Sequence, residues 1–303
     1  MTRRAVLCLT ILLTSAAAGA NDAPTREPDL AYGAYQRGQY FAAVREATTR
    51  LDRNPDDAAA MTLLGELHNQ GLGVRQDPAK AAEWYRLAAE RGDAHALAAL
   101  GLMALDGRGM DKDPSRGKAW LEEAAAKNEP RASYNLALLL LSTGAPADLS
   151  HAVELLRRAA EKEVGDAQHA LGVLYLRGRG VSRDPAEAAR WFLKATGNNN
   201  PSGEVEYAIL LFNGEGVAPN EGLAARLFRR SAARGNIVAQ NRLARLYVAG
   251  RGVPKNLVEA AAWHLTASAK GLTDPWLDAA LRQLGPEERA RAERLANERA
   301  GLL

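Results

Sequence analysis

The sequence has little cysteine, little net charge and no long hydrophobic run. Its single cysteine is Cys8, so the chain beyond it can contain no disulfide, no thiol nucleophile and no cysteine-ligated metal. Lysine and arginine number 39 and aspartate and glutamate 36, and this interspersed, near-neutral mixture does not indicate a nucleic-acid-binding surface. With 47% hydrophobic and 25% charged residues, the composition is that of an ordinary globular protein.

The N-terminal segment has the order of an export signal. Arg3 and Arg4 precede an apolar run over 5–13, and small residues follow up to Ala20. This pattern predicts a secretory signal peptide cleaved after Ala20, with Cys8 inside the removed segment. A transmembrane anchor is the alternative, but it needs about 20 apolar residues. We therefore expect a signal peptide over 1–20, a linker over 21–28, and a periplasmic or secreted mature chain without a membrane span.

A glycine-x-glycine pattern recurs along the chain. Its second glycines are spaced by 36, 71, 36 and 36 residues, and the step of 71 is two periods less one residue. A degenerate copy therefore falls in this gap, where Thr143 and Gly144 are in phase and the turn has lost a residue. Such repetition indicates a solenoid rather than two ordinary domains. The glycine pairs are Gly71 and Gly73, Gly107 and Gly109, Gly178 and Gly180, Gly214 and Gly216, and Gly250 and Gly252.

Each repeat predicts two helices. The segment 166–176 contains no proline and places Leu171, Leu174 and Tyr175 on one stripe, which predicts a first helix, called helix A. The glycines end helix A because a residue without Cβ adopts a left-handed conformation at little cost. An aspartate or asparagine then caps a second helix, called helix B, often with proline at its first position. These expected caps are Asp77, Asp113, Asp148, Asp184, Asn220 and Asn256.

Two further features recur at one phase of the repeat. Small residues stand at positions 65, 101, 137, 172, 208 and 244, where they let helix A approach its partner helix closely. Helix B carries Trp84, Trp120, Trp191 and Trp263 at equivalent positions, which indicates core packing rather than a ligand cage.

The glycine turns, the Ala-x-x-x-Leu-Gly segment before them and the Trp-Tyr or Trp-Phe pair after them resemble Sel1-like repeats, relatives of tetratricopeptide repeats. The resemblance implies an all-α fold, an α-solenoid of stacked helix-turn-helix repeats coiled into a right-handed superhelix. Six copies, the third degenerate, cover 56–271. Residues 29–55 resemble a tetratricopeptide-like N-terminal cap, and 272–303 are expected to form C-terminal capping helices, because a solenoid needs polar-faced ends.

Motifs that would indicate catalysis are missing from the sequence. The glycine turns lack the following Gly-Lys-Ser/Thr of a phosphate loop, and neither His-Glu-x-x-His nor Gly-x-Ser-x-Gly occurs. His95, His151 and His169 fall at different repeat phases, which would scatter a metal site along the solenoid, while His68 and His264 occupy packing positions. We therefore expect no catalytic residue, no cofactor and no metal.

Tetratricopeptide-like stacking would place the A helices along a concave groove, so their outward positions are the candidate partner-binding residues. The middle of this surface is unusually apolar, as in grooves that bind a helix or an extended peptide, although some of its side chains could instead pack between adjacent repeats. The candidates, called the A-face set, are Glu66, Asn69, His95, Leu102, Leu105, Asp106, Tyr134, His169, Leu176, Arg177, Ile209, Phe212, Asn213 and Arg245.

Two functional classes follow from the sequence. The first is a non-catalytic scaffold or regulator of the bacterial periplasm or cell envelope, which binds a protein or peptide partner in the concave groove. The alternative is a periplasmic enzyme acting on a β-lactam or cell-wall-like substrate, because some cysteine-rich Sel1-like proteins have been linked to β-lactams. This chain lacks those cysteines and any Ser-x-x-Lys motif, which favours the scaffold.

Overall fold

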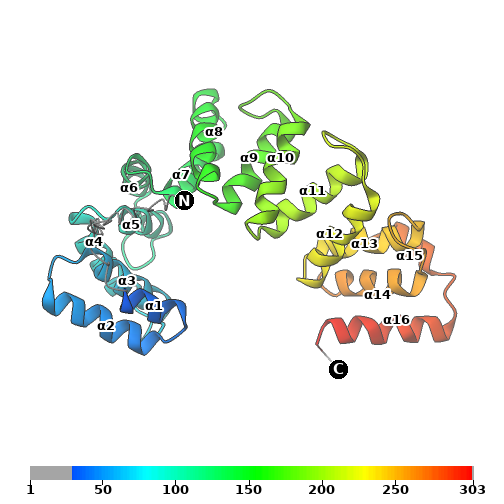
Figure 1. The fold of residues 1–303 in the computed structure, drawn as a ribbon, viewed down its shortest axis with the longest axis horizontal. Helices are drawn as coiled ribbons and strands as arrows, with labels where there is room; N and C mark the ends of the chain where they lie inside the picture. The colour runs from blue at the N-terminus through cyan, green and yellow to red at the C-terminus, as the bar shows by residue number, and fades with distance from the viewer. Residues whose placement is uncertain (1–28, 302–303) are drawn as a thin grey trace, which may run out of the picture.

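The computed structural model describes residues 29–301, and the regular secondary structure of this range is α-helical throughout. Successive antiparallel helix pairs stack into an open arch (Figure 1). The predicted all-α solenoid is therefore confirmed. The expected signal peptide and linker, residues 1–28, lie outside the described residues.

The helices follow the A and B alternation that the repeat predicts. Before the repeats come α1 (Leu30–Gln36) and α2 (Tyr40–Arg53), and after them α15 (Pro275–Leu281) and α16 (Pro286–Arg299). The A helices are α3 (Ala58–Gln70), α5 (Ala94–Asp106), α7 (Pro130–Thr143), α9 (Gly165–Arg177), α11 (Pro201–Asn213) and α13 (Ile237–Ala249). The B helices are α4 (Pro78–Glu90), α6 (Pro114–Ala126), α8 (Pro146–Glu161), α10 (Pro185–Gly197), α12 (Glu221–Ala233) and α14 (Leu257–Ser268).

Glycines and caps define the turn between the two helices of a repeat. Gly178 ends α9 with a φ of 65°, in the left-handed region that glycine adopts without strain. The backbone N–H of Lys80 donates to the Asp77 carboxylate at 3.0 Å, and that of Leu223 donates to Asn220 at 2.9 Å. The predicted capping of helix B by Asp or Asn is thus observed in both of these repeats.

The small residues of helix A allow the two helices of a repeat to touch. A Cβ added to Gly65 would lie 2.7 Å from the ring of Tyr85, and one added to Gly172 would lie 2.6 Å from the ring of Phe192. Both rings are completely buried. Helix A therefore supplies backbone surface on which a large side chain of helix B packs.

The third repeat differs from the prediction in its turn. Asp148 does not cap helix B: it lies in the first turn of α8, whose N-cap is Ala145, and its carboxylate accepts a hydrogen bond from Thr143 Oγ1 at 2.6 Å. The reason is that only two residues, Gly144 and Ala145, separate the end of α7 at Thr143 from the start of α8 at Pro146. The degenerate repeat is therefore joined by a tight turn rather than by a binding loop.

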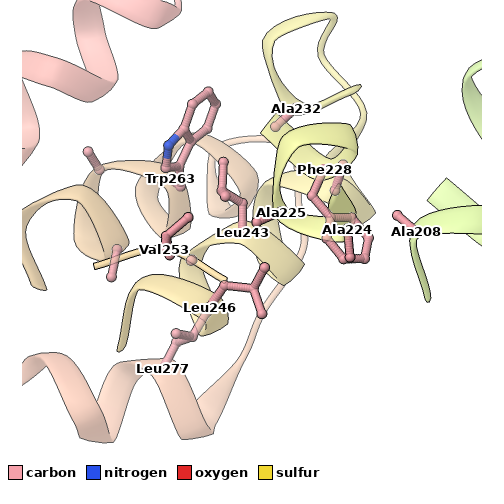
Figure 2. Close-up of a cluster of buried hydrophobic side chains, with 14 of the residues drawn as sticks. Ala208, Ala224, Ala225, Phe228, Ala232, Leu243, Leu246, Val253, Trp263 and Leu277 are labelled. Atoms are coloured by element: carbon pink, nitrogen blue, oxygen red, sulfur yellow. The ribbon is translucent and has the colours of Figure 1, made fainter. Parts of the chain in front are cut away.

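The C-terminal helices share a core with the last two repeats. Leu277 of α15 is fully buried in the same cluster as Phe228 and Trp263, and Figure 2 shows these side chains gathered with Leu246 of α13. Because α14 packs against both α15 and α16, the end of the solenoid and its final helices form one apolar unit.

A left-handed residue follows every helix B of the six repeats, and Glu163 is the least suited to it. Glycine takes this place after α4, α12 and α14, asparagine takes it after α6 and α10, and Glu163 has a φ of 62° after α8. The turn is closed by Val164 N–H donating to the Ala159 carbonyl at 3.2 Å.

We expect Glu163→Gly to stabilise the chain by about 1 kcal/mol, because it removes the left-handed strain of a residue with a Cβ. The control is Glu161→Gly in the last turn of α8, which should destabilise by about 1 kcal/mol because glycine disfavours a helix. Urea midpoints followed by circular dichroism measure both. Shifts in the same direction would contradict the assigned backbone geometry.

Candidate functional site

The structure places the A-face set along the A helices, and none of its members is fully buried. In the left and upper parts of Figure 1, α5 and α7 lie nearer the hollow of the arch than α6 and α8. Members of the first and last repeats are far from one another, because α3 and α13 belong to opposite arms of the arch. The set is thus a long surface rather than one site.

Several apolar members of the set are half-buried side chains of the core. Leu105 and Tyr134 pack against the cluster that joins the second, third and fourth repeats, and Leu176 packs against the cluster around Phe192. Their contacts between helices account for much of the apolar character that the sequence shows. Their exposed edges remain on the surface of the A helices.

Two polar members of the first two repeats, Glu66 and His95, have partners within the chain. Tyr85 donates its hydroxyl hydrogen to Glu66 at 2.7 Å. His95 Nδ1 lies 3.8 Å from the carboxylate of Glu129, and this contact raises the pKa of His95. Although burial opposes its charge, Glu129 has a lowered pKa because His95 lies beside it and the Ala132 N–H donates to it. These groups stabilise the groove as well as lining it.

The structure brings four members of the set together at the fifth and sixth repeats. Ile209, Phe212 and Asn213 of α11 and Arg245 of α13 line one cavity of about 240 Å³, called the α11–α13 pocket. Pockets for drug-sized ligands span roughly 300–1,000 Å³, so this one suits a single side chain. Its other lining residues are Phe228, Arg242, Leu246, Ala249, Arg251 and Trp276.

Two of the pocket arginines are held in place by aromatic and acidic neighbours. Arg245 donates to the Asp274 carboxylate through Nε at 2.7 Å and Nη2 at 2.9 Å, and its guanidinium lies 5.0 Å from the ring centre of Trp276. Arg251 lies 4.1 Å over the ring of Phe212 and pairs with Glu221 on its other side. Arg245, a member of the A-face set, is therefore already paired within the chain.

A third arginine extends the positive charge along the groove. Arg242 is exposed on α13, and the half-buried Glu206 on α11 feels the charges of both Arg242 and Arg177 on α9. Burial raises the pKa of Glu206, and the two arginines partly oppose that rise. The A helices of the last three repeats therefore carry a line of guanidinium groups beside an apolar pocket.

Comparison with known families agrees with this architecture. A family model described as Sel1 repeat matches six consecutive segments, 58–93, 94–129, 130–164, 165–200, 201–236 and 237–272. The chain belongs to the Sel1 repeat family. Each matched segment contains one A helix and one B helix, so the resemblance inferred from the glycine turns is confirmed. Sel1 repeat proteins generally mediate protein–protein interactions.

Solved Sel1 structures share the fold. A Sel1 repeat protein from Oxalobacter formigenes is similar with a TM-score of 0.67 and 27% identity, over 80% of this chain and 97% of that one. The protein c5321, a protective antigen of uropathogenic Escherichia coli strains, is similar with a TM-score of 0.55 and 24% identity, over 90% of this chain and 67% of that one. The second likeness shows the fold alone.

A curated relative matches a smaller part. Chitin synthase regulatory factor 3 of Schizosaccharomyces pombe is 30% identical over 145 residues, which are 47% of this Sel1 chain and 12% of the yeast protein. Because the match covers only a small fraction of the yeast protein, the regulatory role of that protein is not assigned to this chain.

Sequence reasoning missed Arg242, Arg251 and Trp276. Arg251 lies in a glycine turn and Trp276 in a helix outside the repeats, so neither occupies a helix A position. The only signal in the sequence was a tryptophan outside the repeat phase; that Trp276 is 48% exposed is seen only in the structure.

Outside the A-face set, the described range has a further cavity, but no candidate metal site and no membrane-spanning helix. A larger cavity of about 550 Å³ lies between α14 and α16, and no member of the A-face set lines it. Within residues 29–301, no group of three His, Asp or Glu side chains is arranged to hold a metal ion, and no helix is long and apolar enough to cross a membrane.

Proposed function

We propose that this Sel1 repeat protein is a non-catalytic scaffold of the bacterial cell envelope that binds a segment of a partner protein along its A helices. The observation that carries the proposal is the α11–α13 pocket, where residues from two repeats meet. Its aromatic and arginine side chains are the types enriched at binding hot spots. Export rests on the expected signal peptide over 1–20, and periplasmic fractionation with sequencing of the mature N-terminus tests it.

The arrangement of the groove suits an elongated partner. A stack of A helices presents equivalent positions repeat after repeat, so a partner helix or extended peptide can contact several repeats at once. Tyr134 on α7 and Phe212 on α11 are half-buried and hold one edge toward the surface. Rigid aromatic side chains that are already packed lose little entropy on binding, which makes them effective anchors.

We expect Phe212→Ala and Tyr134→Ala to weaken the binding free energy of the captured partner by about 2 kcal/mol or more in total, because truncating aromatic anchors removes buried contact area. The measurement is affinity capture from an envelope extract with the mature chain as bait, followed by titration of the identified partner. The matched control is Phe41→Ala on α2, since Phe41 is 82% exposed and outside the A helices.

Each variant is first compared with the wild type by circular dichroism, so that a loss of partner reports binding rather than folding. If Phe41→Ala weakens the partner while Phe212→Ala and Tyr134→Ala bind it normally, the groove assignment is wrong. Loss of binding only when the exposed surface of the B helices is altered would contradict it equally.

A further inference from the structure

We infer that the α11–α13 pocket receives an apolar side chain from an acidic peptide segment of the partner, and that the C-terminal helix α15 is part of this site. The inference rests on the proposed function, because it specifies the chemistry of the partner. Its basis is the combination of one apolar cavity, three arginines at its wall and a tryptophan supplied from outside the repeats.

The cavity selects an apolar group of limited size. Its floor consists of Phe228 and Leu246, which are almost fully buried, and Ile209 and Phe212 form half-buried sides. Trp276 stands at the edge with nearly half of its surface exposed. A leucine or phenylalanine side chain placed there would cover the exposed indole and remove apolar surface from water, which is favourable at roughly 25 cal/mol per Å².

The charges around the cavity select carboxylates. Arg242, Arg245 and Arg251 line it, and no acidic residue does. The carboxylate of Asp274 is 4% exposed and pairs with Arg245, so it fixes the guanidinium and offsets its charge, and Arg245 offers the pocket N–H donors rather than net positive charge. Arg242 forms no ion pair with any residue of the described range. Carboxylates flanking the bound side chain would therefore find charged donors in place.

The surrounding acids favour a peptide over a nucleic acid. Glu206 is influenced by the charges of Arg177 and Arg242, Glu221 pairs with Arg251, and Glu215 pairs with Arg183. A uniformly charged phosphate backbone would meet these carboxylates along the groove, whereas a peptide can place its acidic residues only beside the arginines.

The position of α15 makes the site composite. Arg245 and Asn241 of α13 both donate to Asp274, the latter at 2.6 Å, and the same residue caps α15. Leu277 is fully buried and anchors the helix to the core of the last repeats. Asp274 is thus a positioning residue: it orients Arg245 and sets Trp276 at the wall of the pocket.

The test uses fluorescein-labelled peptides and fluorescence polarisation with the mature chain. The probe contains Asp-Glu-Phe-Asp-Glu between Gly-Ser linkers, and two matched peptides replace either the four acids by lysine or the phenylalanine by alanine. We expect the probe to bind at least about tenfold more tightly than both. Arg242→Gln and Trp276→Ala should each weaken it by about tenfold, while Arg86→Gln on the exposed face of α4 leaves it unchanged.

Arg242→Lys keeps the charge and should retain most of the binding, which separates an electrostatic role from a structural one. Equal affinities for the three peptides, or full binding by Arg242→Gln and Trp276→Ala, would overturn the inference. Tighter binding of an oligothymidine than of the probe would also overturn it. So would a dimer, detected by sedimentation, that no longer binds the probe. If these peptide tests fail but Phe212→Ala still weakens binding of the captured partner, only the acidic-peptide inference is wrong and the proposed scaffold function stands. If the probe binds as expected but no A-face variant weakens binding of the captured partner, the proposed scaffold function is wrong.

Discussion

Gly216→Ala is expected to lower the free energy of unfolding by about 3 kcal/mol or more. The second glycine of a turn packs against the preceding helix B: a Cβ on Gly216 would lie 2.2 Å from the carbonyl oxygen of Pro185 and 2.6 Å from the backbone nitrogen of Ala186. Overpacking against backbone costs about 1–3 kcal/mol, and the φ of 70° adds about 1–2 kcal/mol for any residue with a Cβ.

Two other turn glycines provide graded controls: Gly180, the second glycine of its turn, and Gly144, which ends α7. At Gly180 the added Cβ would be 3.1 Å from the Leu149 carbonyl, and at Gly144 nothing lies within 4 Å. All three have a positive φ, so the backbone strain is common and only the packing differs. The expected order of destabilisation is therefore Gly216→Ala, then Gly180→Ala, then Gly144→Ala at about 1 kcal/mol.

Urea denaturation followed by circular dichroism at 222 nm gives the order of the three midpoints. Because repeat arrays can unfold in parts, amide hydrogen exchange at the start of α10 should show whether the loss in Gly216→Ala is local to the junction of the fourth and fifth repeats. Equal midpoints for Gly216→Ala and Gly144→Ala would show that the turn does not clamp the preceding helix.

The repeat explains why so much of the fold could be predicted from the sequence. A left-handed turn needs glycine, a helix N-terminus needs an acceptor such as Asp77, and a close helix contact needs a small residue such as Gly65. Each requirement is local and recurs at one phase. Repetition turns weak single signals into a consistent pattern. The prediction for Asp148 was wrong because it assumed the common turn length in the repeat that had lost a residue.

The composition of the pocket could not be predicted in the same way. Arg245 and Asp274 are 29 residues apart, and Asp274 belongs to a segment without repeat periodicity, so no phase relation links them. Counting helix positions identified Phe212 and Arg245 as outward-facing, but it could not show that α15 folds back beside α13 and adds Trp276. A contact made once, outside the repeated pattern, has to be seen in three dimensions.

The link between Asp274 and Arg245 also makes stability depend on pH. Burial alone would raise the pKa of Asp274, but hydrogen bonds from Arg245 and Asn241 outweigh it and lower the pKa from 3.8 to about 2. A carboxyl group with a lowered pKa in the folded state stabilises the fold above its unfolded pKa. That contribution is lost as the pH falls through the folded pKa. The affected window therefore runs from about pH 4 down to about pH 2.

Asp274→Asn is accordingly expected to destabilise the chain by about 2 kcal/mol at neutral pH, because the two pKa values differ by nearly two units and each unit corresponds to about 1.4 kcal/mol. Asparagine still offers an oxygen to cap α15, so the loss reports the ion pair.

The control is Asp56→Asn, which removes a 79% exposed carboxylate paired with Arg91 and should cost less than about 1 kcal/mol. Urea midpoints measured from pH 7 to pH 2 should show the gap between wild type and Asp274→Asn closing only in acid. A gap that is constant with pH, or one no larger than that of Asp56→Asn, would contradict the assigned role of Asp274. Because the same carboxylate orients Arg245, Asp274→Asn should also weaken the acidic probe peptide at neutral pH, where Asp56→Asn binds it normally.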